Sequence, residues 1–122
     1  MAKILIIDDD PDVRTVMNIL LKKQGHEVET AARKEEVFDK INQFGPAVIL
    51  LDVLLSGADG RKICKDIKEN EATKNIPVIM FSAHPGAADK IDAYGADDFI
   101  AKPVNADTLL ERIGRQLDQP GQ

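Results

Sequence analysis

The most constraining feature of this sequence is a run of apolar residues that ends at a carboxylate. Residues 47–51 read Ala-Val-Ile-Leu-Leu, follow Gly45-Pro46 and lead directly into Asp52. An uninterrupted apolar run of this length beside turn residues is typical of a strand buried on both faces. Such a strand needs a neighbour on each side, so the chain must build a sheet around it. Asp52 then lies at the carboxyl end of this central strand, at the rim of the sheet, within reach of water and ligands.

Four more segments have strand character. Residues 4–7 and 78–81 are apolar throughout, residues 26–31 alternate polar and apolar side chains, and residues 99–101 form a short apolar stretch. Uniform apolar character predicts a strand buried on both faces, whereas alternation predicts a half-exposed strand. We therefore expect the first, third and fourth strands in the middle of the sheet, and the second and fifth at its edges.

Helical spacing follows each of the five strands. After the first strand, Asp10-Pro11 predicts a helix start, an apolar stripe follows, and Gly25 predicts the helix end. A weak fourth helix is expected after Pro85-Gly86, and residues 53–60 and 68–75 are expected to be loops. The apolar positions that define the other helices are Val13, Val16, Met17 and Leu20; Val37, Phe38 and Ile41; Ile63, Cys64 and Ile67; and Val104, Leu109, Leu110, Ile113 and Leu117.

Fivefold alternation of strand and helix predicts an α/β fold, in which right-handed crossovers make a doubly wound, five-stranded parallel sheet with helices on both faces. The expected strand order is 2-1-3-4-5, the flavodoxin-like order. The 122 residues suit one domain, which we expect to have its core at about residues 3–117 and a polar tail at residues 118–122.

Charge and cysteine content narrow the function classes. The net charge is −5 and no cluster of Lys or Arg stands out, which argues against nucleic acid or an anionic membrane as the partner of this domain. Cys64 is the only cysteine, so we expect a reduced, cytoplasmic compartment. The apolar stretch at residues 4–7 is too short for a signal peptide or a membrane span.

Polar residues stand at the carboxyl ends of four strands. Asp8 and Asp9 end the first strand, Asp52 the third, Ser82 the fourth and Lys102 the fifth. In the expected order these strand ends are neighbours along one edge, next to the reversal point where such sheets bind ligands. Three close carboxylates repel one another unless a cation intervenes, and ligands that are all oxygen favour Mg²⁺. Asp52 is then the candidate nucleophile that forms an acyl phosphate.

The same motifs resemble the receiver domain of bacterial two-component response regulators, in order and over residues 3 to about 117. They are Ile-Ile-Asp8-Asp9-Asp10-Pro11, Leu-Leu-Asp52, Asp59-Gly60, Ser82-Ala83 and Lys102-Pro103. The resemblance implies a phosphorylation-activated signalling switch rather than an enzyme, with a sensor histidine kinase or a histidine phosphotransfer protein as the phosphoryl donor. It leaves open whether the output is a downstream protein or an output domain of a longer regulator.

The resemblance also implies a role for each site residue. Asp52 matches the phosphoacceptor. Asp9, Asp52 and the backbone carbonyl of Leu54 would ligate Mg²⁺ directly, and Asp8 would act through a water. Lys102 would contact the phosphoryl group, Ser82 would move to hydrogen-bond it, and Phe99 matches the aromatic that turns inward as Ser82 moves. Leu54 and His84 match two positions that modulate dephosphorylation. The family often has a cis peptide at Lys102-Pro103, and its kinase-side partners dock on the first helix, here near Pro11, Arg14 and Thr15.

Two other functions fit part of the pattern. Asp8-Asp9-Asp10 also reads as Asp-x-Asp after a strand, which resembles aspartate-nucleophile phosphohydrolases of the haloacid-dehalogenase type. That family places its lysine before the later acidic pair, whereas Lys102 comes after Asp97-Asp98. A degenerate receiver that binds a partner without phosphorylation is the second alternative, and the complete set of site residues argues against it.

Overall fold

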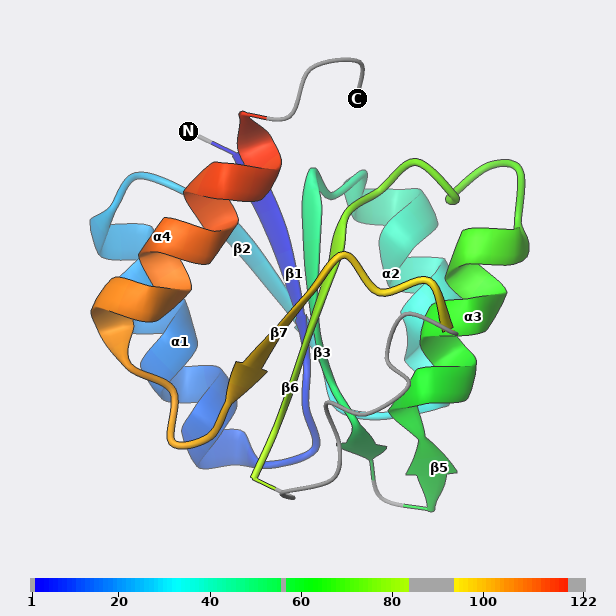
Figure 1. Ribbon diagram of the computed structural model, residues 1–122, viewed down its shortest axis with the longest axis horizontal. Coiled ribbons are helices and arrows are strands. Elements are labelled where there is room, and N and C mark those ends of the chain that lie inside the picture. Colours follow the sequence, from blue (N-terminus) through cyan, green and yellow to red (C-terminus); the bar gives the residue numbers. More distant parts are fainter. Residues whose placement is uncertain (1, 56, 84–93, 119–122) are drawn as a thin grey trace.

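Five parallel strands form the central sheet in the computed structural model of the protein, which describes residues 2–55, 57–83 and 94–118 (Figure 1). The strand order is β2-β1-β3-β6-β7, which counted along the chain is the expected 2-1-3-4-5. The flavodoxin-like fold is therefore confirmed. The strands of this sheet are β1 (Lys3–Ile7), β2 (Glu27–Ala31), β3 (Val48–Asp52), β6 (Val78–Ser82) and β7 (Asp98–Ala101).

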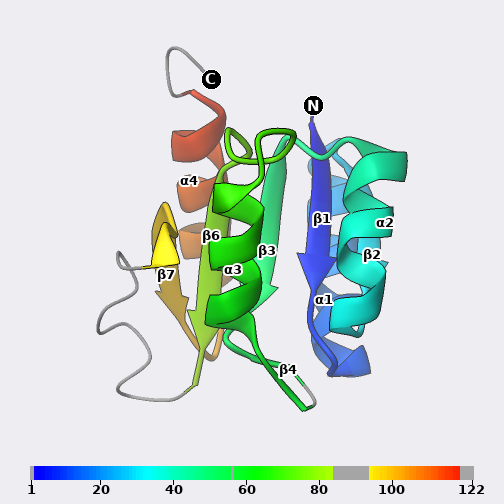
Figure 2. The same ribbon diagram turned by 90° about the vertical axis from the view of Figure 1, so that its right-hand side faces the viewer.

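Helices cover both faces of the sheet. In Figure 1, α1 and α4 lie on one side and α2 and α3 on the other, and Figure 2 looks onto the side with α2 and α3. The carboxyl ends of β1, β3, β6 and β7 all point to the lower edge in Figure 1. The helices are α1 (Pro11–Lys23), α2 (Lys34–Phe44), α3 (Gly60–Glu69) and α4 (Ala106–Leu117).

The strands supply two separate apolar layers, because successive side chains of a strand point to opposite faces. Leu5 and Ile7 of β1 pack in the layer that also holds Val37 of α2. Ile4 and Ile6 pack in the other layer. Every residue of β3 and of β6 is buried, whereas β2 and β7 are only partly buried. The burial pattern that we used to predict the strand order is thus the one observed.

Two predicted loops contain more regular structure than expected. Residues 53–60 include a small antiparallel hairpin, in which β4 (Leu54–Leu55) pairs with β5 (Ala58–Asp59). The prediction of a plain loop was wrong there, since pairs of two-residue strands are too short to leave a periodic pattern. Helix α3 runs to Glu69, so the loop predicted from Lys68 begins two residues later.

Helix α1 begins as the sequence predicts. Pro11 is its first residue, and the Asp10 side chain accepts a hydrogen bond from the Asp12 N–H at 2.9 Å. The prediction for Val16 was wrong, because this side chain is 64% exposed instead of facing the core. Val104, expected in the last helix, lies before its first residue, Ala106.

Helix α1 ends at Lys23, and Gly25 follows with a φ of 88°. His84 lies outside the described residues. The predicted fourth helix also lies outside them, apart from Tyr94 and Gly95 at the end of that segment. The expected cis peptide at Lys102-Pro103 is present.

Candidate functional site

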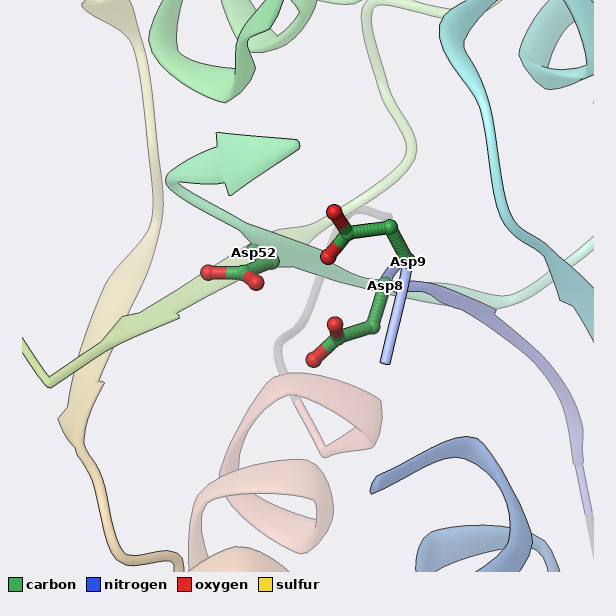
Figure 3. Close-up of side chains that lie close together, drawn as sticks. All are labelled: Asp8, Asp9 and Asp52. Atoms are coloured by element: carbon green, nitrogen blue, oxygen red, sulfur yellow. The ribbon is translucent and has the colours of Figure 1, made fainter. Parts of the chain in front are cut away.

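The strand ends bring the predicted acidic residues to one edge of the sheet. Asp8 and Asp9 follow β1 and Asp52 is the last residue of β3, and these two strands pair in parallel with Ile7 opposite Leu51. One ligand oxygen from each of the three carboxylates lies within 4.8 Å of the others. Figure 3 shows the three side chains at the ends of the two neighbouring strands.

Burial makes it costly to keep the carboxylates of this acidic cluster charged. Asp8 is completely buried and Asp52 is 5% exposed, while Asp9 is the most open of the three. Removing a carboxylate from water disfavours its charged form. Burial, with a contribution from the nearby Asp52 charge, raises the pKa of Asp8 to about 6, against the hydrogen bond from Asp10 and the charge of Lys102.

Lys102 is the cation of the site. Its Nζ lies 3.2 Å from Asp8 Oδ2 and 3.2 Å from Asp52 Oδ2, and it lies 5.0 Å from the centre of the Phe81 ring. Burial alone would lower the pKa of Lys102, but the charges of Asp52 and Asp8 outweigh it and raise that pKa. One ammonium among three carboxylates leaves the site strongly acidic in total, and this favours an additional cation.

Backbone groups orient the two buried carboxylates. The Asp10 N–H donates to Asp8 Oδ1 at 2.9 Å, and the Leu54 N–H donates to Asp52 Oδ1 at 3.3 Å. Lys102 occupies the other oxygen of each carboxylate. All donor atoms of the cluster are oxygens, which is the ligand set that suits Mg²⁺ rather than zinc. The residues present therefore fit a hard divalent cation.

Ser82 and Phe99 occupy neighbouring strands. Ser82 is the last residue of β6, is 3% exposed, and its carbonyl accepts a hydrogen bond from the Lys102 N–H at 2.9 Å. Phe99 lies inside β7, opposite Met80, and is partly buried against the layer beneath α2 and α3. The structure thus places Ser82 at the carboxyl end of β6, hydrogen-bonded through its backbone to Lys102, and Phe99 within the sheet on β7.

Gly60 lies against the backbone of the proposed acceptor. A Cβ atom at this position would lie 2.0 Å from the Asp52 carbonyl oxygen, and the Gly60 N–H donates to the Val53 carbonyl at 2.6 Å. Only a residue without a side chain lets the hairpin fold this closely over the end of β3. The sequence contains Asp59-Gly60 as a motif, but its spacing alone does not predict this contact.

Arg14 is a site neighbour that the sequence pattern does not reveal as one. Its Nη1 donates to the backbone carbonyl of Asp8 at 2.8 Å. A side chain in the first turn of a helix points back toward the helix N-terminus, which brings it to the loop after β1. The only signal in the sequence is a long donor six residues after Asp8.

Comparison with known proteins decides the family. The model of the family described as "Response regulator receiver domain" matches residues 4–114 of this chain. The chain belongs to this family. The match selects the receiver over the phosphohydrolase alternative, and it identifies a signalling domain of two-component systems.

Individual relatives agree with this assignment. The DNA-binding dual master transcriptional regulator RpaA of a Synechocystis strain is 36% identical over 115 residues, which are 93% of this chain and 48% of that protein. The chain spans about half the length of the curated relatives it matches.

Solved structures of similar proteins cover the chain almost completely. The chemotaxis protein CheY4 of Vibrio cholerae has 32% identity and a TM-score of 0.88, over 96% of this receiver chain and 99% of that chain. The BeF3-activated N-terminal receiver domain of Klebsiella pneumoniae RstA has 28% identity and a TM-score of 0.86, over 96% and 99%. In the described part of this receiver chain, no helix is both long and apolar enough to cross a lipid bilayer.

Proposed function

We propose that this receiver domain accepts a phosphoryl group on Asp52 from a phosphohistidine of a sensor histidine kinase or a histidine phosphotransfer protein. Asp8, Asp9 and Asp52, together with the backbone carbonyl of Leu54, would hold Mg²⁺. The observation that carries this proposal is the acidic cluster itself, in which three carboxylate oxygens lie within 4.8 Å of one another beside a lysine ammonium.

The chemistry is a transfer from nitrogen to oxygen. A carboxylate oxygen of Asp52 attacks the phosphorus, the P–N bond of the phosphohistidine breaks, and its electron pair returns to the imidazole, leaving an acyl phosphate on Asp52. Mg²⁺, when bound, neutralises the carboxylates and the phosphoryl oxygens. Lys102, which now bridges Asp8 and Asp52, supplies a second positive charge to the transferred group.

Ser82 is the residue that we assign to the switch step. Its hydroxyl-bearing side chain stands at the carboxyl end of β6, and its backbone is bonded to Lys102. We propose that Ser82 moves to donate a hydrogen bond to the phosphoryl oxygen, and that Phe99 on the adjacent strand β7 turns inward as Ser82 moves. The altered surface then changes the binding of a downstream protein or of an output domain of a longer regulator.

The compartment and partners of the domain belong to the same proposal. A cytoplasmic location fits a chain with one cysteine, Cys64, which is buried and free, and a phosphoryl donor on the cytoplasmic side. We expect neither nucleic acid nor a membrane to bind this domain directly, and no turnover beyond gain and loss of its own phosphoryl group. A pull-down with and without beryllofluoride would identify the output partner.

Phosphorylation by a small acyl phosphate tests the acceptor directly. With acetyl phosphate and Mg²⁺, intact-mass spectrometry is expected to show one added phosphoryl group on the wild-type protein and none on Asp52→Asn. Asp66→Asn, which changes an exposed acid on α3, is the matched control and should be labelled like wild type. Label that survives in Asp52→Asn but disappears in Asp8→Asn would support the phosphohydrolase reading instead. An unlabelled wild-type protein would support a degenerate receiver.

A further inference from the structure

Arg14 makes a contact that the proposed phosphoryl transfer does not use. Its side chain is half-buried, and Nη1 donates to the Asp8 backbone carbonyl at 2.8 Å. Among the described residues it forms no ion pair with a carboxylate. A half-buried guanidinium that bonds the backbone oxygen of an acidic residue rather than its side chain indicates a structural role at that oxygen.

The bonded carbonyl belongs to the peptide unit that joins Asp8 to Asp9. A peptide unit is planar, so fixing its oxygen restricts ψ of Asp8 and φ of Asp9 together. The other side of Asp8 is already fixed, because its N–H donates to the Ala31 carbonyl at 3.1 Å. Arg14 therefore completes the restraint of Asp8 and sets the direction in which the chain presents Asp9.

We propose that Arg14 is a positioning residue for the divalent-cation site, acting through the Asp8–Asp9 peptide unit. This inference rests on the proposed function, since it concerns the same carboxylates. It differs from the role that the resemblance implies for Arg14, which is a contact for a docked kinase-side partner. Arg14 touches none of the reacting atoms, and its effect is on how well Asp8 and Asp9 converge with Asp52.

Charge and position make opposite predictions for the loss of Arg14. Removing a positive charge near the site would, by Coulomb's law alone, strengthen the binding of a divalent cation. Releasing the Asp8–Asp9 peptide unit would weaken it, because the ligands lose their preorganised geometry. The sign of the change in Mg²⁺ affinity therefore separates the two effects.

The experiment compares Arg14→Met, which keeps an unbranched apolar stem, with Arg14→Lys, which keeps the charge. Mg²⁺ is titrated while the backbone amide signals of the site are followed by NMR. We expect Arg14→Met to weaken Mg²⁺ binding about tenfold, the lower end for loss of a partner that orients metal ligands. Arg14→Lys should lie between Arg14→Met and wild type. Lys22→Met, on the exposed last turn of α1, is the control and should bind Mg²⁺ like wild type.

A second measurement separates metal positioning from partner docking. At low Mg²⁺, Arg14→Met should accept phosphate from acetyl phosphate more slowly than wild type, and saturating Mg²⁺ should restore the rate with an unchanged KM for the donor. Mg²⁺ affinity that is equal to or tighter than that of wild type would overturn the inference, as would a defect confined to transfer from a protein donor. If Arg14→Met does not fold, the Mg²⁺ affinity of Arg14→Lys is compared with that of Lys22→Met, and Arg14→Lys is expected to bind Mg²⁺ more weakly. A wild-type protein that binds no Mg²⁺ would instead refute the proposed function itself.

Discussion

The interior of the sheet and its carboxyl edge are built from the same strands, but the interior buries apolar side chains and the edge buries carboxylates. Ile4 to Ile7 of β1 are fully buried and apolar, and their layers are filled by the helices. One residue further on, Asp8 is equally buried but carries a carboxyl group whose pKa is raised to about 6 by that burial. The chain stabilises its own interior, whereas its edge keeps an excess of negative charge. That difference is why we propose the carboxyl edge as the place where a ligand binds.

The largest effect is expected in the interior. Leu50 of β3 is fully buried in the layer beneath α1 and α4, so Leu50→Ala should lower the free energy of unfolding by about 3 kcal/mol. Val16→Ala removes an apolar side chain that is 64% exposed, and should change it by less than about 0.5 kcal/mol. Urea denaturation of both variants makes the measurement, and equal losses would show that Leu50 is not packed in the interior as described.

At the carboxyl edge, removal of a buried charge should raise the free energy of unfolding, whereas Leu50→Ala lowers it. The folded protein raises the pKa of Asp8 from 3.8 to about 6, so it binds this proton more tightly than the unfolded chain. Asp8 therefore costs little stability below pH 3.8; the cost grows as the pH rises from there through about 6 and is complete above that value. Without divalent ions, Asp8→Asn should be more stable than wild type at pH 8 by on the order of 2 kcal/mol, with the difference vanishing near pH 4.

Urea denaturation of wild type and Asp8→Asn at the two pH values provides the measurement, since titrating groups that do not interact with Asp8 cancel in the difference. Mg²⁺ should stabilise wild type and have a much smaller effect on Asp8→Asn, because the variant lacks one carboxylate of the cluster. A variant that is less stable than wild type at pH 8 would mean that Asp8 is held by favourable contacts, and that the edge is not under electrostatic stress.

The smallest effect concerns the lifetime of the phosphoryl group. Leu54 is 57% exposed beside Asp52 and cannot hydrogen-bond an attacking water. Leu54→Asn should speed decay of the acyl phosphate about fivefold, since one hydrogen bond of about 1 kcal/mol in the transition state corresponds to that factor. The decay is followed by intact-mass spectrometry after removal of the donor, with Leu54→Ala as the control for lost side-chain bulk. An unchanged or slower decay in Leu54→Asn alone would contradict the prediction.

The sequence predicts the interior well because burial leaves a direct pattern in it. The unbroken apolar runs around Leu5 and Leu50 identify the central strands, and the alternation in β2 identifies an edge strand, so the sheet order follows. Val16 was placed wrongly because the apolar spacing of a helix defines a stripe without defining its width. The β4–β5 hairpin was missed because its strands have two residues each.

The sequence predicts which residue types lie at the carboxyl ends of the strands, but it does not predict their burial or their energetics. Strand ends and the parallel sheet bring Asp8, Asp52 and Lys102 together, as expected. The sequence does not show that Asp8 is completely buried while Asp9 is open, because that depends on how the loop after β1 turns. It also cannot show that Arg14 bonds the Asp8 carbonyl or that Gly60 lies against the Asp52 carbonyl, since both contacts involve the backbone, which is the same for every residue type.

The most direct test is a crystal structure of the protein grown with Mg²⁺ and beryllofluoride. We predict one ion bound directly by oxygens of Asp9, Asp52 and the Leu54 backbone carbonyl and through a water by Asp8. Beryllofluoride should be on Asp52, with Lys102 turned from the carboxylates toward the fluorines. A structure in which Lys102 still bridges Asp8 and Asp52, with neither the ion nor beryllofluoride at this edge, would contradict the account.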